Sequence, residues 1–297
     1  MTSSSAKSLR PRLLVAGAAA LWGMWSLCFR TAEHASKAPL SGALETFAAW
    51  AVMLAVTLPL AIRDTRARAP GSSARTARAW LLVASLGVTD ALTGMLFFSA
   101  MQKTTVAVAV LTHYLQPLLT ALAAPVFLGE RWRKKTFVAL ALALAGLFLL
   151  LDPLAAPAGD LVGAGLGALS AVTFSATLLL GKKLGDTLST WELSAYPKPV
   201  SLAVLALAVP AGGFAALAEP KVSAILVGGS LVFGALSLVM FYRGLAKTPA
   251  SQAGVLTLCE PLVAVFVGVL AWREVPGPLA LLGALLVLAG AAVISVD

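Results

Sequence analysis

Long runs of hydrophobic residues alternate with short polar stretches along the whole chain. A helix needs about 20 mostly apolar residues to cross the roughly 30 Å hydrocarbon layer of a membrane, and exposed irregular backbone is excluded from that layer. The pattern therefore predicts an all-α integral membrane protein. Its ten expected transmembrane helices cover residues 13–31, 42–62, 79–101, 105–128, 135–151, 161–181, 190–212, 222–243, 250–272 and 277–296.

The composition excludes an ordinary soluble domain. Of the 297 residues, 59% are hydrophobic and 12% are charged, and the mean hydropathy is +0.91, far from the balance of soluble proteins. The two cysteines, Cys28 and Cys259, lie inside apolar runs and lack metal-ligand spacing. We therefore expect buried thiols and no bound metal or cofactor.

Basic residues are distributed unevenly between the two sides of the predicted helices. Sixteen Lys and Arg residues lie on the side of the N-terminus, five lie on the opposite side, and Lys198 falls inside a helix. By the positive-inside rule, this asymmetry places both termini in the cytoplasm. Orientation explains the net charge of +9, contact with anionic membrane lipid is a secondary role, and no nucleic-acid partner is expected.

The chain contains an internal repeat. Residues 103–146 align with residues 247–290 at a constant offset of 144, and a fainter match places residues 16–21 over residues 164–169. Each copy holds five predicted helices, which divides the chain into repeats at 1–152 and 153–297. Because five is odd, the second copy enters the membrane from the opposite side, an arrangement that many secondary transporters use to place a substrate site near mid-membrane.

Matching prolines interrupt the fourth and ninth predicted helices. Pro117 and Pro261 have no backbone N–H, so the carbonyl groups of His113 and Thr257 lose their helical donors. In hydrocarbon, a freed carbonyl needs a donor from a neighbouring helix, a side chain, water or a substrate. Two interpretations stay open, a substrate site at the interruptions or proline kinks whose polar neighbours join the helices.

Polar side chains accompany both interruptions and are candidates for substrate binding. His113 and Gln116 share a helix face, and Thr257 and Glu260 repeat that spacing in the second copy. Glu260 is an acid at membrane depth, which favours a functional role as a proton carrier or as a counter-charge for a substrate ammonium group. His113 could relay protons, although a neutral packing histidine is an equal alternative.

Two further charged residues fall deep in the predicted membrane region. Asp90 lies near the middle of the third helix, and Lys198 lies between Pro197 and Pro199, which interrupt the seventh helix. Lys198 can pair with Asp90, pair with Glu260, or extend to the inner interface, and a structural ion pair is an open alternative to a coupling role.

Aromatic residues within the runs are candidates for an aromatic wall around a ring-bearing substrate. About half of them are expected to be interfacial or packing residues instead. Trp22 is the strongest candidate, because it lies well inside the first helix. The full set is Trp22, Trp25, Trp50, Tyr196 and Tyr242.

Several stretches resemble a known family. The sequence "LCEPLVAVFVGVLAWREVPGPLALLGALLVLAG" in the second copy and "GERW" in the first are similar to the paired EamA-type repeats of the drug/metabolite transporter superfamily. Within it, Tyr114-Leu115-Gln116-Pro117 and Asp90 resemble features of bacterial YddG-type aromatic amino acid exporters. That resemblance implies a ten-helix inner-membrane exporter with Tyr114 at its substrate site. Many family members have Glu-Pro in both copies, whereas this chain has Gln116 in the first.

The sequence therefore favours a secondary transporter that exports small amphipathic metabolites, with aromatic amino acids as the substrates that the resemblance implies. Proton coupling through Glu260, Asp90 or His113 stays open. A lipid-modifying membrane enzyme and an ion channel are the alternatives, but two histidines cannot build a multi-histidine metal site, and a channel does not need an inverted duplication. Glu130 and its repeat partner Glu274 are expected to hold loops at the membrane interfaces.

Overall fold

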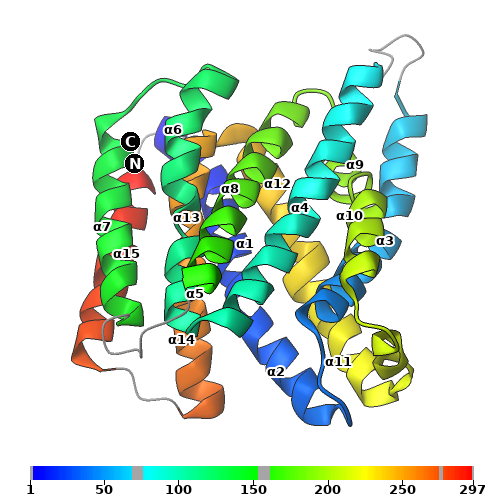
Figure 1. Cartoon of the computed structure of the whole chain (residues 1–297). Helices are drawn as coiled ribbons and strands as arrows, with labels where there is room; N and C mark the ends of the chain where they lie inside the picture. The colour runs from blue at the N-terminus through cyan, green and yellow to red at the C-terminus, as the bar shows by residue number, and fades with distance from the viewer. Residues whose placement is uncertain (1–2, 69–75, 153–160, 274–276, 296–297) are drawn as a thin grey trace.

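The computed structural model describes residues 3–68, 76–152, 161–273 and 277–295, and every regular element in these ranges is helical (Figure 1). The elements of the first half are α1 (Ser3–Gly23), α2 (Trp25–Ala35), α3 (Gly42–Arg66), α4 (Ala77–Lys103), α5 (Val106–His113), α6 (Gln116–Leu128) and α7 (Lys134–Leu151). Those of the second half are α8 (Leu161–Leu184), α9 (Thr190–Ala195), α10 (Lys198–Ala208), η1 (Gly213–Ala218), α11 (Pro220–Gly229), η2 (Ser230–Leu236), α12 (Ser237–Lys247), α13 (Ala250–Thr257), α14 (Cys259–Trp272) and α15 (Pro278–Ser295).

These elements form an all-helical membrane bundle, as the hydropathy pattern predicts. Within the described ranges, nine spans are long and apolar enough to cross a membrane. The remaining predicted helix, the seventh at 190–212, is the interrupted pair α9 and α10, and it ends earlier than expected at Ala208. The physical reason is that Pro210 cannot continue the helix and Gly212 takes a left-handed conformation with φ of 77°.

The first predicted helix also differs from expectation. It is longer than residues 13–31, and a turn at Met24 divides it into α1 and α2 without a proline. The eighth predicted helix, 222–243, contains a π-helical segment, η2, in which backbone bonds span five residues rather than four. Close packing accompanies this segment, because a Cβ atom on Gly234 would lie 2.9 Å from the sulfur of Met53.

Contacts between helix ends show that the two halves have opposite orientations. A Cβ atom on Gly244 of α12 would lie 2.6 Å from the carbonyl oxygen of Pro11, near the start of α1. Lys182, near the end of α8, donates to the carbonyl of Leu245, the residue after Gly244. The first helix of one half therefore begins where the first helix of the other half ends. We call this end of the bundle, where α3 ends and α4 begins, the basic end.

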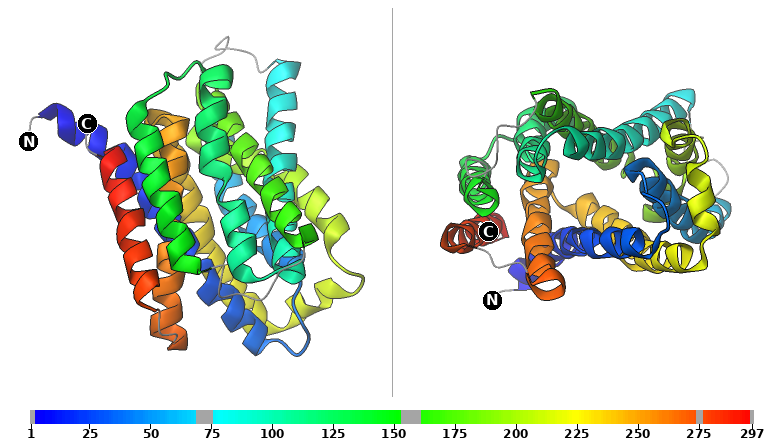
Figure 2. Two further views of the ribbon diagram at one scale, coloured as in Figure 1. Left: turned by 60° about the vertical axis from the view of Figure 1, so that its left-hand side comes forward. Right: turned by 60° about the horizontal axis from the view of Figure 1, so that its bottom comes forward.

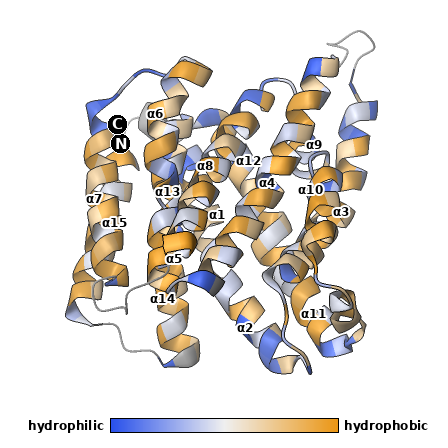
Figure 3. Cartoon of the chain, viewed as in Figure 1, coloured by the Kyte–Doolittle hydropathy of each residue, from blue (hydrophilic) through white to orange (hydrophobic). Residues whose placement is uncertain are grey.

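Helices of the two halves are interleaved rather than stacked as separate bodies. Helix α4 of the first half packs along α8 of the second half, and α1 of the first half packs along α12 and α14 of the second half. Figure 2 shows the helices surrounding a common centre, with α7 and α15 paired at one side. Most of the length of these helices is hydrophobic, and hydrophilic residues gather mainly toward the ends of the bundle (Figure 3).

The pairing of α7 with α15 depends on small residues. A Cβ atom on Gly146 would lie 2.6 Å from the carbonyl oxygen of Gly283, and one on Gly290 would lie 2.6 Å from the carbonyl oxygen of Ala139. Because lipid tails are as apolar as the side chains, close van der Waals contact of this kind is what holds such helices together.

We predict that Gly146→Ala lowers the free energy of unfolding by about 1–3 kcal/mol, since the added methyl group must displace backbone atoms of α15. Gly165→Ala in α8 is the matched control, because its added Cβ meets no atom within 4 Å and the helix gains about 0.5–1 kcal/mol. Thermal unfolding in detergent measures both changes. Equal melting temperatures for the two variants would contradict the packing argument.

Candidate functional site

Asp90 lies halfway along α4 at the centre of a polar cluster inside the bundle. Its Oδ2 atom accepts hydrogen bonds from Lys198 Nζ, at 2.9 Å, and from the indole N–H of Trp50. The hydroxyl oxygen of Ser201 lies 2.9 Å from Asp90 Oδ2 and also 2.9 Å from the carbonyl oxygen of Gly87. Groups from α3 and α10 thus converge on one carboxylate oxygen. We call these four residues, Asp90, Lys198, Trp50 and Ser201, the Asp90 cluster.

The interruption between α9 and α10 places Lys198 in this cluster. Pro197 and Pro199 lack backbone N–H groups, and α9 ends before them at Ala195 while α10 begins at Lys198. The Lys198 side chain is 3% exposed, whereas that of Asp90 keeps 17%. The Lys198 ammonium also lies 4.3 Å from the centre of the Trp50 ring, a favourable cation–π geometry.

A second polar group lies where the interrupted helices α5–α6 and α13–α14 meet. Gln116 has no exposed surface. Its Nε2 atom donates to Thr120 at 2.8 Å. Its Oε1 atom lies 3.4 Å from the hydroxyl of Thr257, in a long bond that shares the proton donated to the carbonyl of Gly254 at 2.7 Å. Thr120 in turn donates to Ser175 of α8 at 3.0 Å. This chain of hydrogen bonds connects three helices and gives each polar group a partner inside the protein.

His113, the last residue of α5, lies within an aromatic stack. Its ring lies parallel to Phe174, with an angle of 12° and a centroid distance of 5.4 Å, and it is 4.3 Å from the ring of Phe97. The Nδ1 atom lies 2.8 Å from the hydroxyl of Ser170, which donates to the carbonyl of Gly167 at 2.6 Å. Because that hydroxyl has one proton, His113 is the donor in the bond to Ser170.

Trp22 extends this aromatic stack toward the second half. Its ring meets Phe174 edge-on at 6.4 Å and lies 4.9 Å from Phe241 of α12. Edge-to-face and tilted contacts at these distances are favourable. Trp22 is half-buried.

Glu260, the second residue of α14, interacts with the phenol of Tyr114 across the meeting point of the interrupted helices. It is half-buried, in contrast to Gln116 at the corresponding position of the first half. A Cβ atom on Gly23 would lie 2.7 Å from Cβ of Val263, so α1 crosses α14 closely just before the turn at Met24.

The structure thus brings the sequence-predicted residues into more than one group. Asp90 and Lys198 form one, and Lys198 pairs with Asp90 rather than with Glu260. Tyr196 is distant from the meeting point of the broken helices. Its hydroxyl lies 2.6 Å from that of Thr65, near the end of α3 at the basic end.

Several residues of these groups were not identified from the sequence. Ser201 lies three residues after Lys198, and Thr120 lies four residues after Gln116, so helical spacing could have found both. Phe97 and Phe174 carry no local signal, because only the packing of α4 and α8 against α5 places them beside His113.

The described residues contain no group of three or more His, Cys, Asp or Glu side chains that could hold a metal ion. Cys28 and Cys259 are free thiols.

Comparison with known proteins gives this arrangement a family. A model of the EamA-like transporter family matches residues 10–152 and, a second time, residues 161–296. The chain belongs to the EamA-like transporter family. A crystal structure with a TM-score of 0.75 aligns over 99% of this EamA protein and 98% of its own chain at 21% identity, which shows a common fold.

Two curated relatives of this EamA protein are described as uncharacterized transporters. One, from Archaeoglobus fulgidus, is 30% identical over 207 residues, which cover 69% of this chain and 73% of the relative. The other, YwfM of Bacillus subtilis, is 28% identical over 218 residues, which cover 73% of this chain and 74% of the relative.

We predict that Lys198→Met lowers the free energy of unfolding by about 3–5 kcal/mol, because it leaves the Asp90 carboxylate inside the bundle without its ammonium partner. The double variant Asp90→Asn/Lys198→Met should recover part of this loss. Arg63→Met is the control, since it removes a positive charge from the exposed side of an ion pair with Asp64, at a cost within about 1 kcal/mol. Additive losses in the double variant would argue against direct coupling.

Proposed function

We propose that this EamA-family protein is a secondary transporter that exports small amphipathic metabolites, most specifically aromatic amino acids. The observation that carries this proposal is the buried Asp90–Lys198 ion pair with the Trp50 ring lying beside it. Charges at membrane depth are costly and usually mark the path of a substrate or an ion.

The Asp90 cluster has the chemistry that a zwitterionic amino acid needs. A substrate carboxylate would pair with the Lys198 ammonium, and a substrate ammonium would pair with Asp90. Two ion pairs with the substrate would then replace the internal ion pair between Lys198 and Asp90. Asp90 keeps 17% of its side chain exposed, which supports access to it. Trp50 offers a ring face, and aromatic side chains prefer such surfaces.

The second group of predicted residues supplies the matching wall of the proposed cavity. Trp22, His113 and Tyr114 offer aromatic surface, and Glu260 offers a second acid for a substrate ammonium or a proton. Gln116 and Thr257 bond to one another here. We propose that they face the substrate only after the halves have moved. Tyr196 would then be a contact on the path at the basic end.

Transport would proceed by rocking of the two inverted halves about these residues. We place the boundary between the halves at residues 152 and 153. The excess of basic residues at the basic end supports a cytoplasmic position for that end and for both termini, in a bacterial inner membrane. Protons could couple to transport through Glu260, Asp90 or His113.

A counterflow assay in proteoliposomes tests the proposal. Labelled phenylalanine, tyrosine or tryptophan should exchange saturably against unlabelled substrate, and alanine and leucine should exchange more slowly. Trp50→Leu should reduce the preference for aromatic over aliphatic substrates by up to about tenfold, the equivalent of one aromatic contact. Trp132→Leu is the matched control, because Trp132 is 57% exposed beyond the end of α6.

Removal of the substrate's charge partners gives an independent test. Asp90→Asn and Glu260→Gln should each lower the initial rate of exchange by at least about tenfold, the effect of losing one charged hydrogen bond. Asp64→Asn, at an exposed ion pair, should leave the rate unchanged. Conductance without exchange would identify a channel, and parent rates in both variants would rule out the proposed site.

A further inference from the structure

The two broken helices are asymmetric, although the repeat relates them. An offset of 144 relates α5 to α13 and α6 to α14. The contact between α6 and α13 therefore has a counterpart between α14 and α5. In the described part of the chain, α6 packs along α13, whereas α5 and α14 do not pack along one another. The half-helices of the basic end are thus packed closely together, whereas those of the opposite end are packed less closely.

Glu130, in the segment after α6, ties the closed pair together. One carboxylate oxygen accepts from the backbone N–H of Ala250 at 2.5 Å, and the other accepts from the N–H and the hydroxyl of Ser251 at 3.2 and 2.8 Å. These groups begin α13, where the helix dipole also favours a negative charge. The residue before α13 is Pro249, which has no side-chain donor or acceptor of its own. The cap of this helix therefore comes from the other half of the protein.

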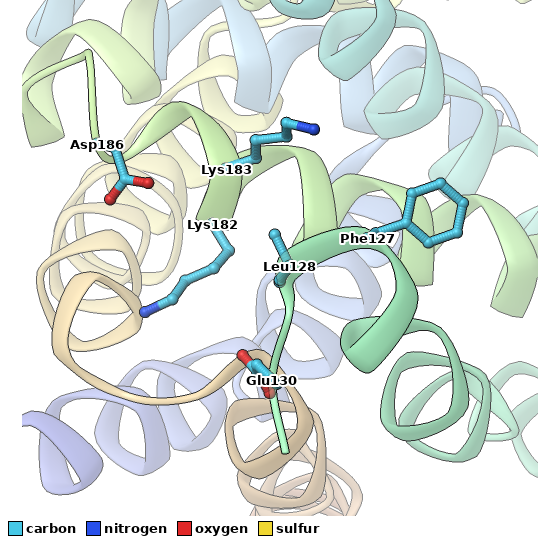
Figure 4. Close-up of a pocket in the computed structure, with 6 residues that line it drawn as sticks. All are labelled: Phe127, Leu128, Glu130, Lys182, Lys183 and Asp186. Carbon is cyan, nitrogen blue, oxygen red and sulfur yellow. The ribbon is translucent and has the colours of Figure 1, made fainter. Parts of the chain in front are cut away.

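Lys182 of α8 binds the end of α12, the helix that precedes α13. Its ammonium donates to the carbonyl oxygens of Leu245, Ala246 and Thr248, at 2.6, 3.1 and 2.9 Å. These carbonyls end α12, so the cation lies at the negative end of a helix dipole. Figure 4 shows Lys182 and Glu130 beside a cavity of about 260 Å³ that Phe127, Leu128, Lys183 and Asp186 also line.

We propose that Glu130 forms a latch, braced by Lys182 within the second half, that holds the basic end closed and that must release the start of α13 before this end can open. This inference rests on the proposed alternating access, and it identifies the contact that gates the basic end. Glu130 joins the ends of α6 and α13, and the bond between Gln116 and Thr257 joins their inner ends at mid-membrane. Opening the basic end requires both contacts to break, and the repeat then predicts closure of α5 against α14.

Distance measurements between spin labels at both ends of the protein test this latch. With Cys28 and Cys259 replaced by alanine, one labelled pair at Arg131 and Lys247 reports on the basic end, and another at Val106 and Leu270 reports on the opposite end. All four labelled positions are exposed. The parent protein should give one main distance for each pair.

Glu130→Gln should raise the ratio of open to closed basic ends by about tenfold, because the amide replaces a charged acceptor and offers only one oxygen. The Arg131–Lys247 distance should gain a longer population, and the Val106–Leu270 distance should gain a shorter population of equal size. Ser251→Ala removes one of the three bonds to Glu130 and should give a smaller shift in the same direction, which keeps the test decisive if the first variant does not fold.

Asp64→Asn is the matched control, because it removes an acidic charge near the end of α3, at the same end of the bundle, where Asp64 pairs with the exposed Arg63. Its distances should equal those of the parent. Unchanged distances in both Glu130→Gln and Ser251→Ala, or an equal shift in Asp64→Asn, would overturn the latch. If the distances shift in the variants but the protein exchanges no amino acid, the latch is retained and the transport proposal is rejected. If the protein exchanges amino acids but the distances stay fixed in the variants, the transport proposal is retained and the latch is rejected.

Discussion

The requirement that polar groups in hydrocarbon find partners inside the protein determines the architecture of this molecule. A proline in a membrane helix leaves a carbonyl without its donor, and a charge at membrane depth needs a counter-charge. The chain concentrates such groups where helices cross. Gln116 forms hydrogen bonds with Thr257 and Thr120, and Asp90 accepts a hydrogen bond from the ammonium of Lys198. The same crossings that stabilise the bundle therefore supply the polar groups that a substrate could use.

Under the proposed alternating access, the inverted repeat gives this asymmetric arrangement of contacts a counterpart with the two ends exchanged. Because the repeats are inverted, every contact at one end has a possible counterpart at the other. At the basic end these contacts are formed: α6 packs along α13, and Glu130 accepts a hydrogen bond from the start of α13. A substrate that changes this balance needs only to bind one conformation more tightly than the other.

Much of the fold could be predicted from the sequence, because hydropathy and the repeat are properties of the chain alone. The all-helical membrane class was predicted correctly, and the family comparison confirms it. The turn at Met24 and the π-helical segment η2 were missed, since neither contains a proline and both depend on tight packing. The prolines flanking Lys198 marked the interruption of its helix but not its partner, because the choice between Asp90 and Glu260 depends on how α10 is rotated against α4.

The candidate site was predictable only in part, for a related reason. Helical spacing showed which polar residues share a face, but the face that meets another helix is decided by packing. His113 and Gln116 lie three residues apart, a spacing that predicts a shared helix face. In the structure, however, His113 contacts Ser170 among aromatic rings and Gln116 contacts Thr257. The side chains that complete the aromatic stack, including Phe97 and Phe174, come from other helices.

The central claim is that a substrate replaces the internal partners of the Asp90–Lys198 ion pair. An experimental density map of the protein in lipid nanodiscs, with an exchanged aromatic amino acid bound, tests it most directly. The account predicts ligand density at mid-membrane with its carboxylate on Lys198, its ammonium on Asp90 or Glu260 and its ring against Trp50. Ligand density elsewhere, with the ion pair between α4 and α10 intact, would contradict it.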